Sequence, residues 1–192
     1  MLSRLNERTE TVKTLLSSYK KSLYIRRALL ALLVVLTALF QNTRGALLQV
    51  NGVRAMPLAV LVAVIALFER SLAGFFFGFL AGVLWDFASA GGDGFFAVVL
   101  CLAGFLCGAA SSFLLRTNVF SALAASFVSI LLTLCAYWFC FLFLKGYDPS
   151  AKLLLSYYLP SCFYTLIFAP IYYYLIKGLK NALDGPKRFV TD

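Results

Sequence analysis

Residues 72–115 read LAGFFFGFLAGVLWDFASAGGDGFFAVVLCLAGFLCGAASSFLL, and this stretch decides the fold class. It contains two apolar runs, at 72–88 and 95–115, on either side of the polar segment SAGGDG at 89–94. Apolar runs of about 20 residues match the thickness of the hydrocarbon core of a bilayer, and a glycine-rich polar segment is typical of a turn. The stretch therefore predicts two transmembrane helices joined by a tight turn.

The rest of the chain has the same character, since 62% of its 192 residues are hydrophobic and only 13% are charged. Soluble domains have about a quarter of their residues charged. Further apolar segments lie at 28–40, 55–68, 119–144 and 153–176. The segments at 28–40 and 55–68 are short for a span and are also compatible with re-entrant or buried core helices. We predict an all-α integral membrane protein, a six-transmembrane-helix bundle, with Glu69 and Arg70 in a tight inner turn.

The distribution of positive charge predicts the orientation of this bundle. With the N-terminus and the C-terminus both cytoplasmic, the outer loops would hold only Arg44, Arg54, Lys145 and Lys152 of the 17 lysines and arginines. Basic residues accumulate on the cytoplasmic side of membrane proteins. We therefore expect a multi-pass protein with both ends in the cytoplasm, and the net charge of +9 indicates contact with anionic lipids and not with nucleic acid.

The chain divides into three parts. Residues 1–25 are predicted to form a cytoplasmic amphipathic basic helix, which would lie on the anionic membrane surface or dock a cytoplasmic partner. Residues 26–179 form the predicted six-helix transmembrane domain, and Arg26 and Arg27 would extend its first span by snorkelling. Residues 180–192 form a short cytoplasmic tail.

Small residues recur along one face of each helix in the deciding stretch. They are Gly74, Gly78 and Gly82 in the first helix and Gly104 and Gly108 in the second. Glycines four residues apart allow another helix backbone to approach closely, which favours association in lipid. Two interpretations stay open, namely packing between these two helices of the same chain and a docking seam for a transmembrane helix of another protein.

Asp86 continues the spacing of the first three glycines and lies at the outer end of an apolar helix. An ionisable residue in a membrane span is a candidate functional residue. An aspartate beside a glycine-rich turn also commonly accepts hydrogen bonds from backbone N–H groups. Both roles are compatible with the sequence.

Candidate catalytic residues are not recognisable. Histidine is absent, which removes the commonest general base and metal ligand. The five cysteines form no CxxC pair, and neither a nucleophile–base pair nor a phosphate-binding loop is found. We expect a protein that is not an enzyme and that has no metal site and no cofactor.

The stretch from Ser71 to Arg116 resembles the glycine-rich segment of the MreD family of rod shape-determining proteins. The family pattern of G-x-x-x-G-[FL]-x-x-G-[LV]-x-x-D is carried here by Gly74, Gly78, Gly82 and Asp86, with Phe79 and Val83 between them. A second part of the pattern falls on Gly94, Ala97, Val98, Gly104, Phe105, Leu106 and Gly108. The resemblance extends over about 28–179, and the 25-residue N-terminal extension departs from it.

This resemblance implies a function, a location and partners. It implies a non-catalytic scaffold of the bacterial rod (elongasome) complex, located in the cytoplasmic (inner) membrane and involved in cell shape and lateral peptidoglycan synthesis. The implied partners are a bitopic MreC-like protein, MreB, RodA, a class B penicillin-binding transpeptidase and membrane lipids. The fold of the family is similar to that of substrate-binding S-components of energy-coupling factor transporters, which is the alternative function.

Overall fold

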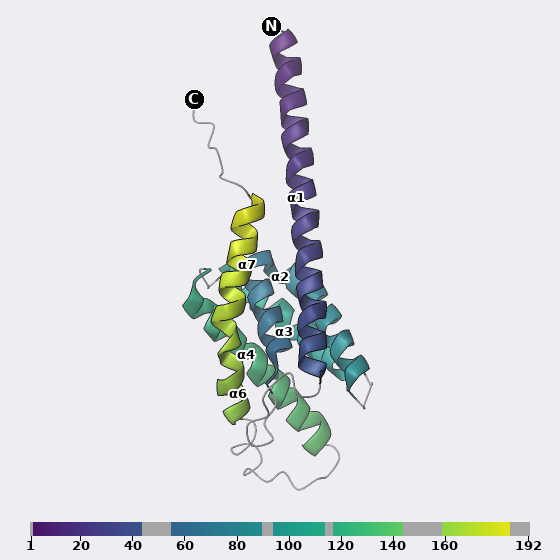
Figure 1. Ribbon diagram of the computed structural model, residues 1–192, viewed down its shortest axis with the longest axis vertical. Helices are drawn as coiled ribbons and strands as arrows, with labels where there is room; N and C mark the ends of the chain where they lie inside the picture. The colour runs from purple at the N-terminus through teal and green to yellow at the C-terminus, as the bar shows by residue number, and fades with distance from the viewer. Residues whose placement is uncertain (1, 44–54, 90–93, 114–116, 144–158, 185–192) are drawn as a thin grey trace.

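The computed structural model describes residues 2–43, 55–89, 94–113, 117–143 and 159–184, and these residues are almost entirely helical (Figure 1). The helices are α1 (Leu2–Asn42), α2 (Pro57–Ala88), α3 (Phe95–Phe113), α4 (Val119–Tyr137), the π-helical segment η1 (Trp138–Phe143), α6 (Leu159–Leu166) and α7 (Phe168–Asp184). Within these ranges, four helices are long and apolar enough to cross a membrane, at Lys21–Asn42, Pro57–Ala88, Val119–Cys140 and Ser161–Leu183. The shorter apolar helix Phe95–Ser111 lies among them. The chain is an all-α membrane protein.

Helix α2 is interrupted at Arg70, whose φ of 72° and ψ of 179° are not helical. A Cβ added to Gly104 would lie 2.9 Å from the carbonyl carbon of Gly74 and 3.0 Å from Cγ1 of Val62. Twelve residues of straight helix span about 18 Å, so Val62 and Gly74 can meet Gly104 together only if the chain folds back between them. The break lies where the sequence predicted a tight turn, and it separates a first half of α2 (57–69) from a second half (71–88).

The first half of α2 forms the centre of the bundle. Every residue from Leu58 to Ala66 is 0% exposed. Residues of this segment contact Gln41 of α1, Gly74 of the second half of α2, Gly104 of α3, Ser129 of α4 and Tyr173 of α7. A helix that is apolar on every side must be buried, and 13 residues span only about 20 Å, less than the roughly 30 Å of a bilayer core. This segment is therefore a core helix enclosed by protein, which is one of the alternatives that its length left open.

The enclosed helix begins inside the protein, so its first N–H groups need partners from the protein. The backbone N–H of Leu58 donates to Oε1 of Gln41 at 3.1 Å, and that of Met56 donates to Oγ1 of Thr165 at 3.2 Å. Further along, the hydroxyl of Ser129 donates to the carbonyl oxygen of Ala59 at 3.1 Å. Side chains of α1, α4 and α6 therefore satisfy backbone groups of the central helix.

The outer surface of the bundle is apolar. Large hydrophobic side chains are exposed on α1, α2, α3, α4 and α7; examples are Leu36, Phe76, Val98, Phe120 and Ile171. An apolar surface of this extent is found on proteins that contact lipid or other membrane proteins. It agrees with the low proportion of charged residues in the sequence.

The basic N-terminal segment and the first apolar segment belong to one continuous helix. Helix α1 extends from Leu2 to Asn42, and its N-terminal part projects beyond the bundle along the helix axis (Figure 1). Residues 2–25 therefore continue the direction of the first apolar segment. At the other end, α7 continues to Asp184, and the rest of the predicted tail lies outside the described residues.

Candidate functional site

The glycines of the deciding stretch meet one another between the second half of α2 and α3. We call Gly74, Gly78, Gly82, Gly104 and Gly108 the glycine seam. A Cβ on Gly78 would overlap the carbonyl oxygen of Leu100 and lie 2.8 Å from its carbonyl carbon. Gly82 faces the backbone of Phe96 and Ala97 in the same way, and Gly74 faces Gly104. At the far end of the seam, a Cβ on Gly108 would lie 2.6 Å from the backbone nitrogen of Ser71.

These contacts place the seam inside the chain. All five glycines are buried, and the atoms that crowd them are mainly backbone atoms of the facing helix of the same hairpin. A helix of another protein therefore cannot reach the glycine faces in this arrangement. Of the two interpretations that the spacing left open, the structure shows packing between the two helices of the deciding stretch.

Asp86 connects the same two helices at the end opposite the Arg70 break. Its carboxylate accepts hydrogen bonds from the backbone N–H groups of Phe96, at 3.1 Å, and of Ala97, at 2.8 Å. The residue is 7% exposed. The first N–H groups of a helix have no intrahelical acceptor, and a negative charge near them is favourable because of the helix dipole. Asp86 therefore caps α3 by accepting hydrogen bonds from N–H groups in the first turn of that helix, which follows the predicted turn segment at 89–94.

Replacing Asp86 by alanine should lower the thermal stability of the purified protein. The substitution leaves the buried N–H of Ala97 and the partly buried N–H of Phe96 without an acceptor, and a buried unsatisfied donor costs about 1–3 kcal/mol. Asp86→Asn keeps one acceptor oxygen and should have an intermediate effect. The measurement is the melting temperature of each variant in mild detergent. Equal melting temperatures for the wild type and Asp86→Ala would contradict this capping role.

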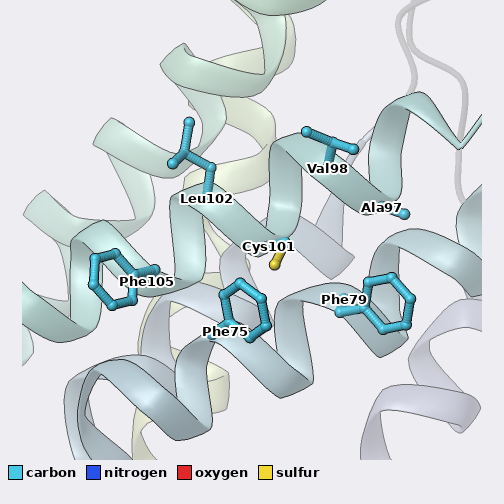
Figure 2. Close-up of a pocket in the computed structure, with 7 residues that line it drawn as sticks. All are labelled: Phe75, Phe79, Ala97, Val98, Cys101, Leu102 and Phe105. Atoms are coloured by element: carbon cyan, nitrogen blue, oxygen red, sulfur yellow. The ribbon is translucent and has the colours of Figure 1, made fainter.

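An open groove lies on the outer side of the glycine seam (Figure 2). It has a volume of about 400 Å³ and only apolar side chains and one thiol line it. The lining residues are Phe75 and Phe79 from α2 and Ala97, Val98, Cys101, Leu102 and Phe105 from α3. We call this feature the apolar groove. Figure 2 shows Phe75, Phe79 and Phe105 around the small side chains of Ala97 and Cys101.

The apolar groove exists because the seam holds the two helices close together. Phe75 and Phe79 each follow a seam glycine by one residue, and Phe105 follows Gly104. Residues adjacent on a helix are about 100° apart, so an aromatic next to a seam glycine stands at the edge of the interface. This groove was not predicted from the sequence. The repeated glycine–phenylalanine pairs are the signal that could have indicated it.

The cysteine and acidic side chains are spread over the parts of the chain that the structure describes. No group of three or more Cys, Asp or Glu side chains that could hold a metal ion occurs there. All five cysteines are free, including Cys101 in the groove.

One comparison with known proteins gave a match. A family model described as 5TMR of 5TMR-LYT matches residues 9–178, which is most of the chain. No curated protein and no solved structure matches the chain. The matched range includes the glycine seam, Asp86 and the apolar groove.

Proposed function

The chain belongs to the 5TMR-LYT family of five-transmembrane proteins, and from this premise we propose that it is a non-catalytic membrane scaffold that binds partner helices. The observation that carries this proposal is the apolar groove. It opens onto the outer surface of the bundle and offers apolar side chains to a partner; the thiol of Cys101 is the one reactive group among its lining residues, and these include no acid or base beside it. Helix association in lipid depends on close van der Waals packing, which a groove between two helices favours.

The proposed occupant is the single transmembrane helix of a bitopic MreC-like protein in the bacterial rod complex. The support for this partner is the resemblance to MreD in the stretch that forms both the seam and the groove. The family that matches the chain is not the MreD family, so the rod complex rests on this resemblance alone. MreB, RodA and a class B penicillin-binding transpeptidase are the further proposed partners.

We also propose a topology for the scaffold, in the cytoplasmic (inner) membrane of a bacterium. Six helical segments would cross or enter the membrane, with both ends of the chain in the cytoplasm. Arg70 at the α2 break, Arg26 and Arg27 in α1, and Lys177 and Lys180 in α7 would then all lie on the cytoplasmic side, as the positive-inside rule favours. The first half of α2 is enclosed by the other segments, so five segments would face lipid, in agreement with a five-transmembrane family.

Photo-cross-linking from the groove tests the proposed partner. Leu102 lines the groove and is 51% exposed, whereas Phe120 of α4 does not line it and is 85% exposed. A photoreactive amino acid at residue 102, in intact cells, should capture a bitopic membrane protein that the same group at residue 120 does not capture. A second substitution, Val98→Trp, should lower this capture severalfold, because the indole would fill the groove.

The identity of the captured protein decides between the functions. Recovery of an MreC-like protein, with RodA and a transpeptidase after mild solubilisation, would support the rod-complex scaffold. Recovery of a transmembrane coupling subunit with paired ATPases would overturn it in favour of a transporter S-component. Identical products from residues 102 and 120 would show that the groove is no specific docking site.

A further inference from the structure

Three cations gather at the end of the bundle that contains the α2 break. Nζ of Lys177 lies 5.6 Å from the centre of the Tyr173 ring, and Nζ of Lys180 lies 5.7 Å from the centre of the Phe68 ring. The two ring centres are 5.4 Å apart, so both ammonium groups lie on one aromatic pair. Arg70 follows Phe68 by two residues and is exposed. We call Arg70, Lys177 and Lys180 the basic cluster.

The acidic residue next to this cluster is already paired. Glu69 forms a salt bridge of 2.7 Å with Arg26, and the two side chains are 5% and 10% exposed respectively. Among the side chains that the structure describes, the carboxylate of Glu69 therefore pairs with Arg26 and not with a member of the basic cluster.

The rings that carry the lysines are held in place. The hydroxyl of Tyr173 donates to the carbonyl oxygen of Thr117 at 2.9 Å, which joins α7 to the residues before α4. Farther along α7, the hydroxyl of Ser22 in α1 donates to the carbonyl oxygen of Leu183 at 2.7 Å. The aromatic surface beneath the cations is therefore preformed, and an anion bound there would not need to order these helices.

We propose that the basic cluster binds the phosphate of an anionic phospholipid. A tyrosine with lysines at the end of membrane helices is typical of the headgroup region, where lipid phosphates are the abundant anions. Basic pockets between transmembrane helices on the cytoplasmic side bind such headgroups. This site is separate from the apolar groove and does not depend on any protein partner.

Native mass spectrometry of the full-length protein tests the proposal, with phosphatidylglycerol or cardiolipin and with zwitterionic phosphatidylcholine as probes. We expect the wild type to retain an anionic lipid in preference to phosphatidylcholine. Each basic residue near a membrane surface contributes about a fivefold increase in affinity for anionic lipid. The double variant Lys177→Gln/Lys180→Gln should therefore weaken retention by about tenfold or more.

Two further variants make the result specific. Arg4→Gln/Arg8→Gln removes the same charge from the N-terminal end of α1 and should leave retention unchanged, whereas Lys177→Arg/Lys180→Arg keeps the charge and should preserve it. The proposal is overturned by equal retention of anionic and zwitterionic lipid, or by an equal loss in the Arg4/Arg8 control. It is also overturned if inorganic phosphate at millimolar concentration displaces the lipid, because the site would then bind free phosphate.

Discussion

Replacing Gly78 by leucine is expected to remove most of the folded protein from the membrane. A Cβ at this position would overlap the carbonyl oxygen of Leu100, and the rest of a leucine side chain would need further space within α3. The crowded atoms belong to the backbone of the facing helix, so no rotamer change can make room. Overpacking of a well-packed core costs about 1–3 kcal/mol even when side chains adjust, and we expect about 3 kcal/mol or more here.

The matched control is the same substitution at Gly178 of α7, where an added Cβ would have no neighbour within 4 Å. Leucine favours a helix over glycine by roughly 0.5–1 kcal/mol, so Gly178→Leu should be neutral or stabilising. The measurements are the amount of protein in isolated membranes and the melting temperature in mild detergent. Normal levels and normal melting of Gly78→Leu, with only partner binding lost, would contradict intramolecular packing at the seam.

Glycine spacing predicted close helix packing but could not predict which helix would pack there. Small side chains permit approach without selecting a partner, since they carry no charge or shape that one helix alone would match. The short segment at 89–94 favours contact between the two helices that it joins. A docking seam for another protein was nevertheless also compatible with Gly74, Gly78 and Gly82.

The break at Arg70 was predictable because the charged pair Glu69–Arg70 interrupts two apolar runs. The complete burial of the first half of α2 was not, because burial on every side depends on how five other segments assemble. Its sequence, PLAVLVAVIALF from Pro57, is apolar on all faces, and a lipid-exposed helix has the same composition. Only its length of fewer than 18 residues indicated a core helix.

The Arg26–Glu69 salt bridge could not be predicted from the sequence either. The two residues are 43 positions apart, and Arg26 was expected to snorkel to the membrane surface together with Arg27. The structure instead turns Arg26 inward, where its residue is 8% exposed, and leaves Arg27 exposed. Adjacent residues of a helix face different directions, so one of the two arginines meets the α2 break and the other does not.

Because Arg26 is buried and Arg27 is exposed, the same substitution at the two positions tests the Arg26–Glu69 salt bridge. Arg26→Met keeps much of the side-chain volume but leaves the carboxylate of Glu69, which is 5% exposed, without its 2.7 Å partner. Removing one member of a buried salt bridge costs about 3–5 kcal/mol. We therefore expect a large fall in the melting temperature. Arg27→Met makes the same chemical change one residue later and should alter stability by less than about 0.5 kcal/mol.

The double variant Arg26→Met/Glu69→Gln separates charge burial from lost packing. If the cost of Arg26→Met comes from the uncompensated carboxylate, neutralising Glu69 should restore a large part of the melting temperature, because a neutral amide is less costly to bury than a carboxylate. If the double variant is no more stable than Arg26→Met, the arginine stabilises the bundle through its other contacts. Equal melting of Arg26→Met and Arg27→Met would show that the pair does not hold α1 against the α2 break.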